Sequence, residues 1–134
     1  LDESGGESYC GNTGCVETIL SGPALQRYYQ SISGVEISLK EIYHRYKEGR
    51  SDDFAVKTMH RLTYFFGRGI SNLVNIIDPD VIVIGGGVGN IDLLYTDGLA
   101  EVRKHVFNPT FDTPIVKPKL GDSAGVFGAA FLVA

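Results

Sequence analysis

The sequence has no long apolar segment and no export signal. No hydrophobic run in its 134 residues approaches the roughly 20 residues that a membrane-spanning helix needs, and no signal peptide is present. With 43% hydrophobic and 21% charged residues, the composition is that of an ordinary globular domain. We therefore predict a soluble, cytoplasmic protein without a membrane partner. The first residue is Leu1 rather than Met, so we expect a processed or excised piece of a longer protein.

An excess of positive charge is also missing. Twelve Lys and Arg residues stand against sixteen Asp and Glu residues, which gives a formal net charge of -4 and an isoelectric point near 5.3. Proteins that neutralise nucleic-acid phosphates need clustered Lys and Arg side chains. The charge balance therefore argues against a nucleic acid as the main partner.

Cysteine is scarce, and its two copies lie close together. Cys10 and Cys15 flank a Gly-rich turn, a placement that favours free thiols or metal ligands over a long disulfide staple. A structural zinc site needs four ligands, usually Cys and His. The histidines of the chain lie in predicted helices on no zinc-like spacing, so the residues alone do not predict a complete zinc site.

Helices are predicted through the first half of the chain after a loop at residues 1–15. The break at Ser21-Gly22-Pro23 predicts that a short helix stops at Leu20 and a second begins at Pro23, followed by a connector over 31–37. The Ser-x-x-Glu pattern from Ser38 predicts a capped helix to about Lys47.

The longest predicted helix runs from Asp52 to about Ile77. Its apolar residues recur at steps of three and four, which is the spacing of one helix face. We expect that face to be buried, and it comprises Ala55, Met59, Leu62, Phe66, Ile70, Leu73 and Ile77. Pro79 disfavours helical geometry at Asp78 and ends the helix there.

The second half alternates strands and helices. Four consecutive β-branched residues, 81–84, predict a strand buried on both faces, as in a parallel or mixed sheet covered by helices. A helix over about 91–106, a short strand over 114–117 and a small-residue helix from about Val126 follow. No repeat or linker interrupts the pattern, so we predict one α/β domain over 1–134.

Glycines follow the predicted strand directly. Ligands of open α/β sheets bind beyond the carboxyl ends of the strands, and Gly85, Gly86 and Gly87 would let the backbone approach a ligand closely. Asn90 occupies the place of the third glycine of the dinucleotide fingerprint, and no Gly-Lys-Ser/Thr of a P-loop follows. The turn predicts either a nucleotide pocket or only a tight turn with close helix packing.

A second Gly-rich turn spans residues 121–125 and also opens a helix. Asp122 and Ser123 are able to hydrogen-bond a ligand or to cap the helix, and capping is the simpler interpretation of each residue alone. The small residues that follow, such as Gly128, favour close packing of that helix.

Ordered motifs make the chain resemble the ROK family of repressors, open reading frames and sugar kinases. The family signature Cys-x-Cys-Gly-x-x-Gly-Cys-x-Glu corresponds to residues 8–17, with Ser8 in place of the first cysteine. Ser21-Gly22, residues 75–87 and residues 121–125 are also similar to ROK sugar kinases. The overall pattern looks closest to the bacterial fructokinase (mannokinase-like) branch.

The resemblance implies the C-terminal lobe, in part, of an actin-like ATPase fold of the ribonuclease H-like, hexokinase type. It places Glu17 against sugar hydroxyls, where a carboxylate accepts hydrogen bonds from a diol; a first-turn glutamate favoured by the helix dipole is the alternative. It also places Gly85, Gly86, Gly87 and Asn90 along the nucleotide. Gly121 and Asp122 would help to close that pocket.

The resemblance further implies a zinc site built from an upstream histidine and three cysteines. Only Cys10 and Cys15 are present, and the hydroxyl of Ser8 is a poor substitute for a thiolate. We expect weak zinc binding or none in this chain. In the intact protein, a histidine with Cys10, Cys15 and a substitute ligand remains open, as does a loop folded without metal.

The implied activity is transfer of phosphate from ATP, with Mg²⁺, to a hexose, preferably fructose. The catalytic Asp and the first phosphate loop of such kinases belong to an N-terminal lobe, and nothing in the chain matches either. We therefore expect no activity from this chain alone. Family members often form homodimers through this lobe. The alternative is a sugar-responsive transcriptional repressor of the same family, with its DNA-binding module upstream.

Overall fold

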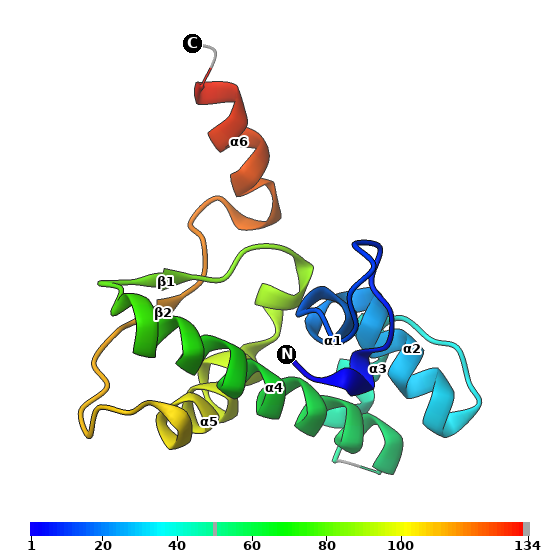
Figure 1. The fold of residues 1–134 in the computed structure, drawn as a ribbon. Helices are drawn as coiled ribbons and strands as arrows, with labels where there is room; N and C mark the ends of the chain where they lie inside the picture. Colours follow the sequence, from blue (N-terminus) through cyan, green and yellow to red (C-terminus); the bar gives the residue numbers. More distant parts are fainter. Residues whose placement is uncertain (50, 133–134) are drawn as a thin grey trace.

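The computed structural model describes residues 1–49 and 51–132. Helices dominate, around the central α4, which spans Asp53–Ile77 (Figure 1). Short 3₁₀ turns, η1 (Glu3–Gly5), η2 (Gly87–Asn90) and η3 (Asp92–Tyr95), lie between the longer elements. Among the described residues, no helix combines the length and apolar character needed to cross a bilayer.

The predicted break after Leu20 is confirmed. Helix α1 covers Glu17–Leu20 and helix α2 covers Gly22–Ser33, with Ser21 between them. The Ser21 hydroxyl accepts a hydrogen bond from the N–H of Ala24 at 3.2 Å, which satisfies one of the free donors at the start of α2. The helix runs three residues beyond the predicted Gln30 and ends at Gly34, whose φ of 75° suits glycine.

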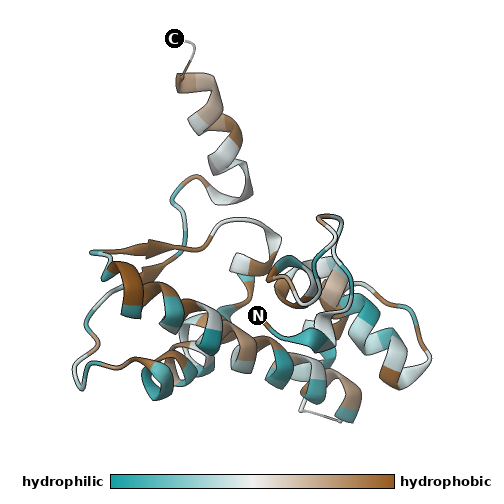
Figure 2. Ribbon diagram, viewed as in Figure 1, coloured by the Kyte–Doolittle hydropathy of each residue, from teal (hydrophilic) through white to brown (hydrophobic). Residues whose placement is uncertain are grey.

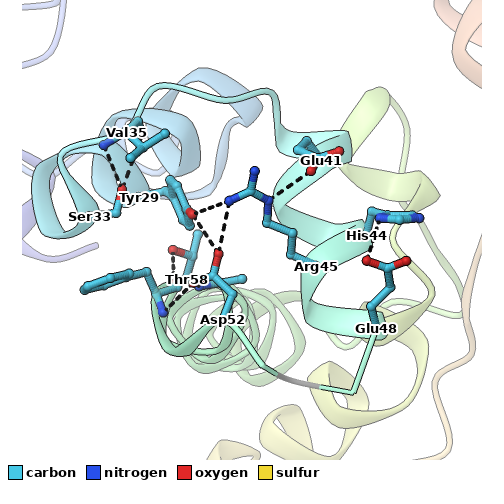
Figure 3. A network of polar contacts seen from close by, with 11 residues as sticks. Tyr29, Ser33, Val35, Glu41, His44, Arg45, Glu48, Asp52 and Thr58 are labelled. Carbon is cyan, nitrogen blue, oxygen red and sulfur yellow. Dashed lines mark hydrogen bonds and ion pairs between the residues drawn. The ribbon is translucent and has the colours of Figure 1, made fainter.

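The Ser38 cap is confirmed as well. Helix α3 spans Leu39–Lys47, and the Ser38 hydroxyl accepts from the N–H of Glu41 at 3.2 Å. The Glu41 carboxylate accepts a hydrogen bond from the Nε of Arg45 one turn later, at 2.9 Å. Beyond that ion pair, the guanidinium of Arg45 reaches Tyr29 and Asp52 on the neighbouring elements (Figure 3).

Helix α4 forms the core, but only along part of its predicted face. Ala55, Met59 and Leu62 are fully buried and Phe66 is 5% exposed. Leu73 and Ile77 were expected to be buried, and this expectation is wrong, because they are 47% and 65% exposed. Leu73 and Ile77 lie on an exposed side of the last turns of α4, whereas Val74 is buried there and the Asn75 side-chain amide donates to the carbonyl of His105, at the end of α5, at 3.1 Å.

Helix α5, Asp97–His105, crosses α4 in close contact. Gly67 permits the approach, since a Cβ atom built there would lie 2.5 Å from the Cβ of Glu101. Gly98 faces Phe66 in the same way, at 3.0 Å. The helix predicted over 91–106 is correct only from residue 97. Before it, Asp92–Tyr95 form η3, and Thr96 interrupts the helical conformation with φ −116° and ψ −86°.

The sheet is smaller than the sequence suggests. Strand β1, Ile82–Val83, pairs in parallel with β2, Ile115–Val116, with Ile82 opposite Ile115. The prediction that the strand is buried on both faces is wrong here: Val81 and Val83 are 49% and 54% exposed. Ile84 packs against the helical core, so helices cover one face of the pair. Within the described residues, nothing covers the other.

The C-terminal helix stands apart from the rest. After the turn η4, Gly121–Ser123, helix α6 covers Ala124–Phe131 and starts two residues before the predicted Val126. It projects away from the other elements (Figure 1). Its apolar side chains are open to solvent, with Val126 and Phe131 each 73% exposed. The ribbon is also coloured as apolar along the sheet and at the end of α4 (Figure 2), where Val83 and Ile76 are exposed.

Candidate functional site: a groove beside a bare glycine turn

The glycine turn after β1 is open. A Cβ atom built on Gly85, Gly86 or Gly87 would meet no atom within 4 Å. Gly86 adopts a φ of 77°, a conformation that residues with a side chain rarely adopt. The backbone is thus bare where a ligand would approach. The tight-turn interpretation does not explain this openness at the three glycines.

Gly89 plays the opposite part in the same turn. A Cβ atom there would lie 2.4 Å from the carbonyl oxygen of Ile84, so this glycine permits close packing of the turn on the strand that precedes it. Both interpretations of the glycine run therefore hold, but at different residues. Gly85 to Gly87 leave open space beside the backbone, whereas Gly89 lets the turn pack closely against Ile84.

A groove of about 630 Å³ opens beside this turn. Its volume lies within the range of small-molecule sites, which are mostly apolar with a few fixed polar groups. Elements α2, α3 and η2 contribute its walls: Gly22, Pro23, Gln26, Leu39, Lys40, Tyr43, Gly87, Val88, Asn90 and Ile91. Two predicted nucleotide-binding residues, Gly87 and Asn90, thus line one groove.

Gln26 is a groove residue that the sequence did not indicate. Its side-chain oxygen accepts a hydrogen bond from the N–H of Leu39 at 3.2 Å. That bond uses the side-chain carbonyl as an acceptor, and the NH₂ group of the same amide is a donor of two further hydrogen bonds. The role of Gln26 depends on how α2 packs against α3, and no local motif in the sequence carries that information.

The second glycine turn lies elsewhere. Gly121 has a φ of 60° and open space around it, and it sits on the segment that leads out to α6 (Figure 1). The groove residues that the structure describes do not include it. The side chain of Asp122 lies outside what the structure describes. The structure does not bring this turn together with Gly87.

Glu17 is the first residue of α1, and its side chain is exposed. Among the described residues, no group pairs with its carboxylate, so both oxygens are available to a ligand. Helix α1 has only four residues, and a dipole effect from so short a helix is small. Ser21 ends α1 and caps α2, so Glu17 lies on the short helix that directly precedes the groove residue Gly22.

The cysteine loop forms a tight hairpin within residues 1–15, for which the sequence predicted only a loop. Glu7 and Thr13 form an antiparallel bridge, and Gly11 and Gly14 adopt φ values of 81° and 74°. The two sulfur atoms, of Cys10 and Cys15, lie 3.5 Å apart at its exposed end.

Hydrogen bonds surround the sulfur of Cys10. The Asn12 side-chain amide donates to it at 3.4 Å. The backbone N–H of Asn12, followed by the side chains of Ser8, Cys15 and Asn12, lowers the pKa of Cys10 to about 7. The Ser8 oxygen is itself buried, and no group meets it in regular hydrogen-bond geometry.

The described residues do not fit a zinc ion. Two thiolates on one tetrahedral zinc would stand about 3.8 Å apart, given Zn–S bonds near 2.3 Å, so the sulfur spacing alone does not decide. The donor count does. The described residues contain no group of three or more His, Cys, Asp and Glu side chains able to hold one ion, and Ser8 offers only a neutral hydroxyl.

A polar network on the far side of the helical core is structural. The Tyr29 hydroxyl donates to Asp52 at 2.7 Å, and Arg45 donates to Tyr29 at 3.3 Å, which joins α2, α3 and the start of α4 (Figure 3). Burial would raise the pKa of Asp52, but hydrogen bonds from Tyr29, from the N–H groups of Ala55 and Phe54 and from Arg45 outweigh it, so the pKa is lowered.

Comparison with known proteins decides the family. The ROK family model matches residues 1–134. The chain belongs to the ROK family. An N-acetyl-D-glucosamine kinase from Vibrio cholerae is 38% identical over 123 residues, which cover 92% of the chain and 40% of that kinase. The ROK chain described here therefore spans about two fifths of the length of the curated relatives it matches.

Solved structures confirm the expected fold class. The ROK hexokinase from Thermus thermophilus superposes with a TM-score of 0.82 at 28% sequence identity. The match covers 97% of the chain and 43% of the hexokinase chain. A ROK glucokinase from Streptomyces griseus, in complex with glucose and AMPPNP, gives 0.77 at 26%, with 92% and 45% covered. A ROK transcriptional regulator, a homologue of the E. coli MLC protein, gives 0.68 at 26%, with 87% and 32% covered. The chain is part of a hexokinase-type, actin-like fold.

Proposed function

We propose that the chain forms the nucleotide-facing part of a sugar kinase that transfers phosphate from ATP to a hexose. The observation that carries the proposal is the bare backbone of Gly85 to Gly87, of which Gly87 lines the 630 Å³ groove. An adenine ring is flat and apolar on its faces, and a backbone without side chains lets such a ring lie against it.

The groove offers matching chemistry for a purine nucleoside. Pro23, Leu39 and Val88 supply apolar wall, and the NH₂ group of Gln26 is a donor suited to a ring nitrogen of adenine. Lys40 at the same groove adds a positive charge that favours a phosphate. The nucleotide analogue in the similar glucokinase supports ATP as the cosubstrate. Gly121 and Asp122 remain proposed contacts.

The hexose would meet Glu17, whose two free carboxylate oxygens suit adjacent hydroxyls. The named relatives phosphorylate N-acetyl-D-glucosamine or bind glucose, which favours a sugar of that series over the fructose that the sequence suggested. Mg²⁺ would neutralise the transferring phosphate. The catalytic base and the first phosphate loop would come from an N-terminal lobe of the same polypeptide, and a homodimer through this lobe remains part of the proposal.

A sugar-responsive transcriptional regulator is the second candidate. The similarity to a ROK transcriptional regulator over 87% of the chain supports it. Such a regulator would use Glu17 for its sugar and need no nucleotide. Binding of MgATP to the protein therefore separates the two candidates.

The test pairs two substitutions in one turn. Gly87→Val places a side chain into open space at the groove, so we expect MgATP binding, measured by isothermal titration calorimetry, to fall at least about tenfold while the midpoint of urea unfolding stays unchanged. Gly89→Ala forces a contact of 2.4 Å with the Ile84 carbonyl, so we expect it to lower the unfolding midpoint instead.

Two outcomes would contradict the kinase proposal. One is equal affinity of Gly87→Val and the parent chain for MgATP. The other is no sugar phosphate above a blank when the full-length protein is assayed with ATP and N-acetyl-D-glucosamine, glucose, mannose and fructose. Within that panel, the preferred sugar is read from kcat/KM.

A further inference from the structure

The cysteine loop presents two thiols that meet each other and no third metal donor. The sulfur atoms of Cys10 and Cys15 are 3.5 Å apart, and both thiols are free, with Cys10 exposed. No other described His, Cys, Asp or Glu side chain completes a metal-binding group with them. The loop thus has the parts of a dithiol rather than those of a zinc site.

We propose that Cys10 and Cys15 form a reversible dithiol–disulfide pair, a modification site for thiol–disulfide exchange. A disulfide bond is about 2.05 Å long, so the sulfur atoms need to approach by only about 1.5 Å. Rotation about the Cα–Cβ bonds of the exposed Cys10 and the half-buried Cys15 supplies such a movement. The hairpin holds the backbone meanwhile, through the hydrogen bond from the N–H of Ser8 to the carbonyl of Asn12 at 2.8 Å.

The surroundings assign different roles to the two sulfur atoms. Asn12 donates its side-chain amide to the sulfur of Cys10, which stabilises the thiolate, and the thiolate is the attacking form. Cys15 lies five residues later with its sulfur already in contact, as a resolving thiol does. The family signature has a third cysteine at the position of Ser8. Because serine cannot form a disulfide, no other thiol in the loop competes with Cys15 for Cys10.

The exchange balances with a low-molecular-weight disulfide such as oxidised glutathione. The Cys10 thiolate attacks one glutathione sulfur, the glutathione S–S bond breaks, and one glutathione thiolate leaves. The Cys15 thiolate then attacks the Cys10 sulfur and displaces the second glutathione thiolate. The protein loses two protons and two electrons, and one glutathione disulfide becomes two thiols.

Closure of the bond would act on the start of α1. The Cys15 carbonyl accepts hydrogen bonds from the N–H and the hydroxyl of Thr18, at 3.1 and 2.9 Å. Cys15 is therefore anchored to the helix that carries Glu17. The chemical proposal stands on the two thiols alone and does not depend on the proposed kinase function.

The test treats the reduced chain with oxidised glutathione in the presence of a chelator and measures its intact mass. We expect the loss of two hydrogen atoms, a Cys10–Cys15 linked peptide after digestion, and full reversal by dithiothreitol. The variants Cys10→Ser and Cys15→Ser keep one thiol each, so we expect each to retain one bound glutathione instead.

A zinc arm separates the dithiol from a metal site. In Ser8→Cys a third thiol joins the loop, and we expect its zinc affinity to exceed that of the parent chain at least about tenfold. The parent should still form its disulfide with equimolar zinc present. Two outcomes would overturn the proposal: one zinc ion held by the parent that protects both thiols, or oxidation that yields only mixed or intermolecular disulfides.

Discussion

Two glycines of α4 provide a sharp test of how the helical core is built. Gly67 and Gly69 lie two residues apart on one helix, yet their surroundings differ completely. A Cβ atom on Gly67 would lie 2.5 Å from the Cβ of Glu101 and 2.8 Å from its backbone carbon. A Cβ atom on Gly69 would meet its nearest neighbour, the side chain of Leu20, at 3.9 Å, which is ordinary contact.

The two changes to alanine should therefore act with opposite sign. Each gains about 1 kcal/mol from the better helix propensity of alanine. Gly67→Ala must also push α5 away by about 1 Å to reach normal contact, and such overpacking costs about 1–3 kcal/mol. The obstacle includes backbone, which a rotamer change does not relieve, so the cost lies at the upper end of that range, about 2–3 kcal/mol. We expect Gly67→Ala to lower the free energy of unfolding by about 1–2 kcal/mol, and Gly69→Ala to raise it by up to about 1 kcal/mol.

Urea unfolding followed by circular dichroism measures both effects. With an m value of about 1.5 kcal/mol per molar, the midpoint of Gly67→Ala should fall by about 1 M, and that of Gly69→Ala should rise by about half as much. Equal shifts of the same sign in both variants would show that α4 and α5 do not cross at Gly67. The close crossing is what positions Phe66 against Gly98, so the packing of the core would then need another account.

Further outcomes concern the network and the caps. Asp52→Asn keeps an N-cap for α4 but removes the charge that Tyr29 and Arg45 bind, so it should cost about 1–2 kcal/mol at pH 7. Because the pKa of Asp52 is lowered in the folded state, the stability that its charge adds is present above the ordinary carboxyl pKa near 4 and is lost as the pH falls through the lower folded value; the difference between variant and parent should shrink in acid unfolding. A gap that stays constant down to low pH would refute the assignment. Ser38→Ala removes the cap of α3 and should cost about 1 kcal/mol in urea unfolding. Ser38→Asp should restore the loss, and a failure to do so would mean that the hydroxyl acts otherwise.

Local signals predicted the helices well, because caps and breaks act over a few residues. Ser21, Ser38 and Asp52 each accept backbone N–H bonds at the start of a helix, and Pro79 follows the end of α4. Two short β-branched runs also predicted both strands, but the parallel pairing of Ile82 with Ile115 was not predicted and comes from the structure. The family emerged from ordered motifs that are specific only when taken together.

Burial could not be predicted in the same way, since it depends on what another segment places over a residue. Val81 and Val83 have the composition of a buried strand, but within the described residues only one face of the sheet is covered. Leu73 and Ile77 continue the apolar stripe of α4 but are 47% and 65% exposed, although Val74 beside them is buried. Periodicity specifies which side chains share a face, and it carries no information about whether that face has a partner.

The candidate site divides along the same line. The order of residues alone placed a run of glycines after a strand, two cysteines around a turn and a glutamate at a helix start, because strand ends, turns and helix starts are local features of the chain. Only the packing of α2 on α3 brought Gln26 to the groove beside Gly87, and only the folded hairpin set the two sulfur atoms in contact. Distances between segments far apart in the chain arise from the balance of contacts in the whole molecule, and no local pattern encodes them.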